Sequence, residues 1–188
     1  MRRIAATLTV VALLFSAGSA WADFDDGLAA YQRGDYATAF REWLPLAEQG
    51  DAGAQQYLGN MYATGRGVLE NDAEAVKWYG KAAAQGHASA QFSLGLMYFN
   101  GEGVTENDAE AVKWFRKAAE QGDALAQKNL GVMYVTGEGV PVNNVKAYMW
   151  WALAKAQSDE GAAGNLDIIK EQMTPADISK AQALVDEW

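Results

Sequence analysis

The 188-residue chain contains no cysteine and a single histidine, His87. Without cysteine it cannot form a disulfide, so its stability must come from packing. The same absences exclude a cysteine nucleophile and the cysteine or histidine clusters that bind zinc. A Ser-His-Asp triad would have to use His87, and the chain has no nucleophile-elbow sequence. We therefore expect no catalytic residue, no metal ligand and no cofactor, and we predict that the protein is not an enzyme.

Basic residues are also scarce. The chain has 15 Lys and Arg against 24 Asp and Glu, a net charge of −9. An acidic surface repels nucleic-acid phosphates and anionic lipid headgroups. We therefore expect the protein to bind neither nucleic acid nor a membrane surface.

Residues 1–22 have the three parts of a secretory signal peptide. Arg2 and Arg3 give a positive start, residues 4–15 are an apolar run, and Ala20-Trp21-Ala22 is an A-x-A cleavage site. The run is shorter than the ~20 residues that span a bilayer, which disfavours the alternative of a membrane anchor. We predict cleavage after Ala22 and a periplasmic or secreted protein, residues 23–188, with 13 basic and 24 acidic residues and a net charge of −11.

One segment of the chain occurs three times with a period of 36 residues. The positions that recur include Gly59, Gly95 and Gly131; Tyr62, Tyr98 and Tyr134; and Trp78, Trp114 and Trp150. A fixed period of this length indicates a solenoid, in which each unit buries its apolar face only against its neighbours.

Each unit contains two helical patterns. In the middle unit, Ala90, Leu94, Met97 and Tyr98 follow the spacing of one helix face, and residues 100–103 form a turn that ends this helix. Asn107 is expected to cap the second helix, with Glu110 as its capping-box partner. We predict units at 23–50, 51–86, 87–122 and 123–158 and C-terminal capping helices within 159–188, the first of them over about 161–173.

Three features could be interpreted as functional sites, and for each of them a structural role is the stronger interpretation. The Gly-x-Gly loops lack the third glycine of a nucleotide-binding loop and follow helices, so they are expected to be tight turns. The recurring tryptophans are expected in the core, where each bridges to the next unit. His87 occupies a turn position that holds Asp51 and Asp123 in the neighbouring units, and we interpret it as a turn residue.

The repeated sequence resembles a known family. Ala-x-x-x-Leu-Gly-x-Met-Tyr, Gly-x-Gly-Val and Asn-Asp-Ala-Glu-Ala-Val-Lys-Trp together resemble the Sel1-like repeat, a longer-looped relative of the tetratricopeptide repeat, over residues 54–156. The resemblance implies an all-α right-handed superhelix with a concave binding face and a scaffold or adaptor role. It extends to periplasmic proteins that regulate envelope signalling, for example by holding a sensor kinase in check in the control of exopolysaccharide synthesis.

A partner site is predicted on the concave face, which the first helix of each pair lines in repeats of this type. The middle helix is apolar on two sides, which requires something to cover it. The predicted site is an apolar patch with a polar rim, the usual mark of an interface, and consists of Gln56, Asn60, Phe92, Leu96, Phe99, Lys128, Val132 and Val135. The alternative is that the last helices fold over this patch.

The predicted function is therefore the binding of a protein or peptide partner, whose identity the repeats do not encode. Two alternatives remain. Some secreted Sel1-like proteins resemble penicillin-binding enzymes and hydrolyse β-lactams, but those are rich in cysteine and this chain has none. The other alternative is a structural adaptor in a secretion or polysaccharide-export assembly.

Overall fold

The computed structural model describes residues 23–188, so the predicted signal peptide lies outside the described residues. This part of the chain forms ten helices and no strand, as the sequence predicted for an all-α fold. The helices are α1 (Phe24–Gln32), α2 (Tyr36–Glu48), α3 (Ala52–Thr64), α4 (Asp72–Ala84), α5 (Ala88–Asn100), α6 (Asp108–Glu120), α7 (Ala124–Thr136), α8 (Asn144–Ala156), α9 (Glu160–Lys170) and α10 (Pro175–Asp186).

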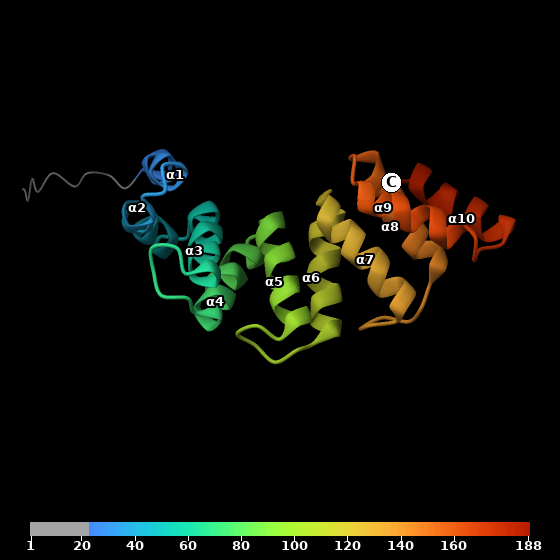
Figure 1. The fold of residues 1–188 in the computed structure, drawn as a ribbon, viewed down its shortest axis with the longest axis horizontal. Helices are drawn as coiled ribbons and strands as arrows, with labels where there is room; N and C mark the ends of the chain where they lie inside the picture. Colours follow the sequence, from blue (N-terminus) through green and yellow to red (C-terminus); the bar gives the residue numbers. More distant parts are fainter. Residues whose placement is uncertain (1–22) are drawn as a thin grey trace, which may run out of the picture.

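The helices stack in chain order as an α-solenoid. Consecutive helices pack against each other from α1 to α9, and α10 packs against α8. The first and last helices therefore lie at opposite ends of an elongated molecule (Figure 1). An odd-numbered helix begins each pair and an even-numbered helix completes it.

Asparagine caps start the second helices of the three regular units. Asn71, Asn107 and Asn143 each accept a hydrogen bond from the backbone N–H three residues later, at 3.0–3.1 Å. Only half of the predicted capping box forms at Asn107, whose own N–H donates to the carbonyl of Tyr98 at 2.8 Å. The Glu110 carboxylate instead pairs with Lys113 at 3.0 Å.

Glycines end the first helices and shape the loops that follow. Gly101 and Gly103 have φ values of 71° and 69°, in the left-handed region that glycine adopts without steric cost. A methyl group on Gly103 would collide with the backbone of Asp72 in the preceding unit, and one on Gly139 with that of Asp108. The Gly-x-Gly loops are thus tight turns, as predicted, and their second glycine also allows contact between units.

Another set of glycines lets the two helices of a pair approach closely. A methyl group on Gly95 of α5 would lie 2.7 Å from Cδ1 of Phe115 on α6. The same relation joins Gly59 to Tyr79 and Gly131 to Trp151. At each of these glycines, an aromatic ring of the second helix occupies the space that a side chain would fill.

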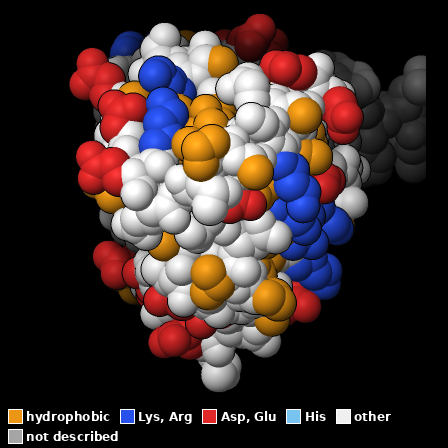
Figure 2. Space-filling model, turned by 90° about the vertical axis from the view of Figure 1, so that its right-hand side faces the viewer, with side chains coloured by type: hydrophobic (Ala, Val, Ile, Leu, Met, Phe, Trp, Pro, Cys, Tyr) orange, Lys and Arg blue, Asp and Glu red, His pale blue; other side chains and the backbone are white. Residues whose placement is uncertain are grey.

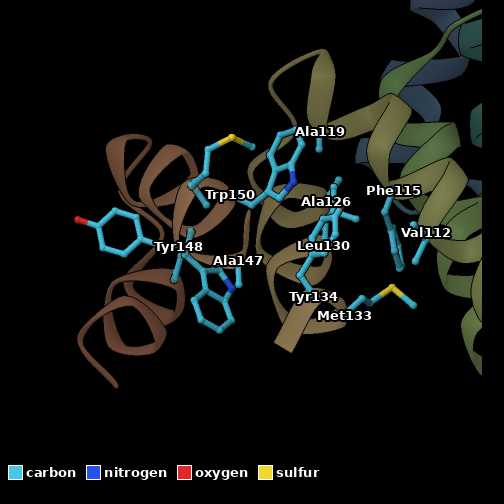
Figure 3. Packing of buried hydrophobic residues seen from close by; sticks show 14 of the residues in the cluster. Val112, Phe115, Ala119, Ala126, Leu130, Met133, Tyr134, Ala147, Tyr148 and Trp150 are labelled. Atoms are coloured by element: carbon cyan, nitrogen blue, oxygen red, sulfur yellow. The ribbon is translucent and has the colours of Figure 1, made fainter. Parts of the chain in front are cut away.

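Apolar side chains from neighbouring units fill the core. In the C-terminal cluster, Leu130 and Met133 of α7 lie between Phe115 of α6 and Trp150 of α8 (Figure 3). Trp78 packs with residues of the first unit and of α3, and Trp114 packs against α4 and α5. Trp78 and Trp150 are buried core residues, as predicted, and Trp114 is partly buried against the core. The predicted direction is wrong for Trp78 and Trp114, because they pack towards the preceding unit.

A ladder of glutamines joins the units through buried hydrogen bonds. Gln91 of α5 is buried and donates to the carbonyl of Ala83 in the preceding unit at 3.1 Å. The side-chain oxygen Oε1 of Gln91 accepts a hydrogen bond from the side-chain amide of Gln121, which follows α6, at 2.7 Å. The same pair of bonds recurs with Gln55 and Gln85 and with Gln127 and Gln157.

Candidate partner-binding surface

Apolar side chains occupy equivalent positions on three successive first helices. Leu96 on α5, Val132 on α7 and Ile168 on α9 are each 36 residues apart, and Phe99 and Val135 lie about one turn beyond the first two. Because equivalent positions of a repeat face the same way, these side chains follow one side of the solenoid. We call Leu96, Phe99, Val132, Val135 and Ile168 the first-helix strip.

The strip remains partly open to solvent. Phe99 is 37% exposed and Ile168 is 60% exposed, while Leu96, Val132 and Val135 are half-buried. The last helix packs on α8, so the two most exposed members of the strip stay uncovered. The predicted alternative is that the last helices fold over the patch. In the structure, α9 borders one side of the strip and leaves Phe99 and Ile168 exposed.

A pocket lies between α7 and α9, where the strip ends. Its volume is about 230 Å³, and Val132, Val135, Ile168, Ile169 and Trp151 supply most of its apolar lining. Thr136, Asn165 and Gln172 provide polar groups at the same pocket. It is small for a drug-sized ligand, whose sites usually measure 300–1,000 Å³, and suits one large apolar side chain.

Phe92 belongs more to the core than to the surface. It is half-buried, and its ring centroid lies 5.7 Å from that of Phe115, a fully buried core residue. The structure therefore brings Phe92 beside the strip but gives its ring a structural contact. Substitution of Phe92 would disturb folding as well as any partner.

The predicted polar residues of α3 form an internal network. Gln56 is only 8% exposed, and its Nε2 donates to Asn60 Oδ1 at 3.2 Å. The same Asn60 oxygen accepts a hydrogen bond from the Tyr79 hydroxyl at 2.7 Å. Burial raises the pKa of Tyr79 to about 12, so the phenol stays protonated and keeps donating. Asn60 continues the register of the strip as a half-buried polar residue, whereas Gln56 is buried in the helix packing.

Lys128 also has an intramolecular partner. Its Nζ lies 3.3 Å from Oδ2 of Asp159, the residue that caps α9. Its backbone carbonyl accepts a hydrogen bond from the Trp151 indole at 3.0 Å. This predicted rim residue therefore links α7 to the start of α9, close to the pocket.

Sequence reasoning missed Ile168, the most exposed member of the strip. The last helix pair lacks the Leu-Gly and Gly-x-Gly sequences that mark the other units, so the repeat was not extended into it. The signal was present, because α9 starts 36 residues after α7 and Ile168 follows Val132 by the same interval. Carrying the period forward would have found it.

His87 caps a helix. Its Nδ1 accepts a hydrogen bond from the Ala90 N–H at 3.3 Å, in the place where Asp51 and Asp123 cap α3 and α7. This confirms its interpretation as a turn residue. Across residues 23–188, no three His, Cys, Asp or Glu side chains are grouped so as to hold a metal ion. None of the helices in this range is long and apolar enough to cross a bilayer.

Two solved structures share the fold. A Sel1 repeat protein from Oxalobacter formigenes is 37% identical, with a TM-score of 0.77, over 80% of this chain and 62% of that one. A protective antigen of uropathogenic Escherichia coli with an SLR fold is 32% identical, with a TM-score of 0.76, over 86% of this chain and 37% of that one. The chain thus spans less than two thirds of either protein.

Two curated relatives match a shorter stretch. They are the exopolysaccharide production negative regulators of Rhizobium meliloti (strain 1021) and Rhizobium leguminosarum bv. viciae, 43% and 40% identical over 60 residues. The match covers 32% of this chain and 22% of each relative, so it reaches about one fifth of the length of those proteins.

The model of the Sel1 repeat matches three consecutive stretches, residues 52–87, 88–123 and 124–159. They cover α3 to α8, more than half of the chain, and include every one of the recurring Leu-Gly and Gly-x-Gly sequences. Proteins built from this repeat generally act as non-catalytic scaffolds for protein–protein interaction. The chain belongs to the Sel1 repeat family.

Proposed function

We propose that this protein is an exported, non-catalytic interaction module that binds a protein or peptide partner on its first-helix strip, the concave face of the solenoid. The observation that carries the proposal is the alignment of Leu96, Val132 and Ile168 at one register, with a pocket where the series ends. Solvent-exposed apolar side chains bordered by polar groups favour association with another protein.

The shape of the strip suggests how a partner would bind. It becomes apolar from α5 onward, since Asn60 holds the equivalent position on α3. An apolar side chain of the partner would fill the pocket between α7 and α9, and its neighbours would lie against Phe99 and Val135. A helix or an extended segment with spaced apolar side chains meets this requirement.

Residues 1–22 support export, so the partner would be a protein of the bacterial envelope or the exterior. The curated relatives are named as negative regulators of exopolysaccharide production. We infer that this chain acts likewise as an envelope-signalling regulator, by holding a partner protein in one state.

Site-specific photo-crosslinking in the source cells tests the proposal. A crosslinkable residue at Phe99 or Ile168 should yield the same covalent partner, and one at Leu69, an exposed loop residue between α3 and α4, should not. The partner should be lost from captures with Phe99→Asp or Ile168→Asp and kept with Leu69→Asp. Circular dichroism should show equal helix content in all three variants.

Two outcomes would contradict the proposal. One is equal crosslinking from Leu69 and the strip, or undiminished capture by both strip variants. The other concerns export: fractionation should find the mature chain outside the cytoplasm, and a chain that stays in the cytoplasm with residues 1–22 attached would refute that part alone.

A further inference from the structure

A second pocket lies away from the first-helix strip, in the C-terminal half of the solenoid. Its volume is about 370 Å³, and it is lined by Arg116, Tyr134, Lys146, Met149, Trp150 and Leu184. These residues come from α6, α7, α8 and α10. We call it the Arg116–Lys146 pocket. It is independent of the partner surface proposed above.

The two cations of this pocket have no acidic partner among the described residues. No carboxylate of residues 23–188 lies within 4.0 Å of Arg116 or Lys146, although acidic residues outnumber basic ones in this chain. Both cations instead contact one phenol. Arg116 donates to the Tyr134 hydroxyl at 3.1 Å, and Lys146 Nζ lies 5.4 Å from the centroid of the Tyr134 ring.

The repeat supplies an internal comparison for these positions. In the two preceding units, the residue equivalent to Lys146 is Glu74 or Glu110, and each of these forms an ion pair with Lys77 or Lys113. The position of those lysines is occupied here by Met149, and Arg116 stands where the preceding unit has Gly80. Where the preceding units have a Glu–Lys ion pair, the third unit therefore has Lys146, which forms no ion pair within residues 23–188, and the apolar Met149. Arg116 of α6 adds a second cation.

The floor of the pocket is apolar. Tyr134, Met149 and Trp150 are all buried, and Leu184 of α10 is half-buried. The ring of Trp188 packs against Trp150, with the centroids 5.0 Å apart. Figure 2 views the C-terminal end of the molecule, where a column of basic side chains lies beside apolar ones. The pocket thus combines positive charge at its rim with an apolar floor.

We propose that the Arg116–Lys146 pocket binds a carboxylate carried on an apolar body. The guanidinium keeps further N–H donors after its bond to Tyr134 and can hold a carboxylate, and the Lys146 ammonium adds a second charge. The apolar body would lie against Met149, Trp150 and Leu184. A small aromatic acid and the C-terminus of a peptide ending in an apolar residue share this chemistry.

Calorimetric titration of residues 23–188 with small probes tests the proposal. 3-Phenylpropanoate has both features, 3-phenylpropanamide lacks the charge, and acetate and inorganic phosphate lack the apolar body. We expect saturable binding of 3-phenylpropanoate and about tenfold weaker binding, or none, of the other three. The amide loses the charged hydrogen bonds, and acetate and phosphate lose the burial of an apolar body. N-acetyl-phenylalanine and its amide then distinguish a peptide C-terminus from a free acid.

Two variants of the pocket and one control make the result specific. Lys146→Glu restores the residue type of the other units, and Arg116→Ala removes the second cation; each should weaken 3-phenylpropanoate binding about tenfold or more. Arg33→Glu makes the same charge change at the far end of the solenoid and should leave binding unchanged. All three positions are exposed, and thermal melts should show that the variants fold.

Several results would overturn the proposal. They are absence of 3-phenylpropanoate binding up to its solubility limit, equal binding by Lys146→Glu, and acetate or phosphate binding as strongly as 3-phenylpropanoate. The last result would mean that the pocket attracts anions without recognising an apolar body.

Discussion

Lys128 of α7 and Asp159, which caps α9, form an ion pair with Nζ and Oδ2 3.3 Å apart. Only 13% of the Asp159 side chain is exposed, and its Oδ1 also accepts a hydrogen bond from the Ala162 N–H at 2.7 Å. One carboxylate therefore both starts α9 and joins it to the helix before it in the first-helix strip. The pair thus links the two helices that border the pocket, α7 and α9.

The Asp159 carboxylate makes stability depend on pH. The Ala162 N–H holds the pKa of Asp159 below its usual value, and Lys128 lowers it further. A carboxyl group with a lowered pKa in the folded state stabilises the fold above its unfolded pKa, about 3.9, and loses this contribution as the pH falls through the lower folded pKa. Asp159→Asn keeps a capping oxygen without the charge, so its free energy of unfolding should fall less steeply below about pH 4. Urea denaturation across this range measures the difference, and parallel curves for the two proteins would contradict it.

The cap of α5 is the weakest of those that start the first helices. His87 accepts its hydrogen bond at 3.3 Å, whereas Asp51 and Asp123 accept theirs at 2.7 and 2.8 Å. An aspartate also adds negative charge at the positive end of the helix dipole. His87→Asp should therefore raise the free energy of unfolding by about 0.5–1 kcal/mol at neutral pH. Chemical denaturation tests this, and the reverse substitution Asp123→His should lower the free energy of unfolding. A loss of stability in His87→Asp would contradict the prediction that aspartate is the better cap.

Two glycines inside helices, Gly95 of α5 and Gly80 of α4, should respond oppositely to substitution by alanine. Gly95→Ala places a methyl group 2.7 Å from the Phe115 ring and should destabilise the fold by about 1–3 kcal/mol. Gly80→Ala, inside α4, meets nothing within 4 Å and should stabilise it by about 0.5–1 kcal/mol through helix propensity. Thermal denaturation of both variants gives the comparison. Equal effects would mean that Gly95 is not required for the close packing of α5 and α6.

The glutamine ladder should contribute measurably to stability. Gln91→Ala removes two hydrogen bonds, because the carbonyl of Ala83 loses the Gln91 donor but keeps that of the Gly86 N–H, and Gln121 loses an acceptor. The expected cost is about 1–3 kcal/mol, because two hydrogen bonds of about 0.5–1.5 kcal/mol each are lost. Gln182→Ala on the exposed surface of α10 is the control and should change stability by less than about 0.5 kcal/mol. If Gln91→Ala matches this control, the ladder does not stabilise the junction between units.

The repeat made most of the fold predictable from the sequence. Asn71, Asn107 and Asn143 are the caps of α4, α6 and α8, and the Gly-x-Gly loops follow the first helices of all three units. These features depend on local backbone chemistry, which recurs with the sequence. The predicted first capping helix, 161–173, ends later than α9, which stops at Lys170 because a turn begins before Thr174.

The candidate site was harder to predict, because burial depends on partners distant in sequence. Gln56 is polar, as expected of a rim residue, yet its Nε2 donates a hydrogen bond to Asn60 and only 8% of the residue is exposed. Lys128 forms its ion pair with a residue 31 positions later, in a unit that the repeat pattern did not reach. The glutamine ladder was missed for a similar reason, since Gln91 has one partner in its own unit and one in the preceding unit.

The contact of Gly103 with Asp72, repeated by Gly139 and Asp108, means that the connecting loops are part of the junction between units. Loops usually tolerate insertions and deletions, but a residue gained or lost here would displace the neighbouring unit. Recombination between relatives should therefore exchange whole 36-residue blocks together with their connectors, so evolution can lengthen or shorten this scaffold only in complete steps.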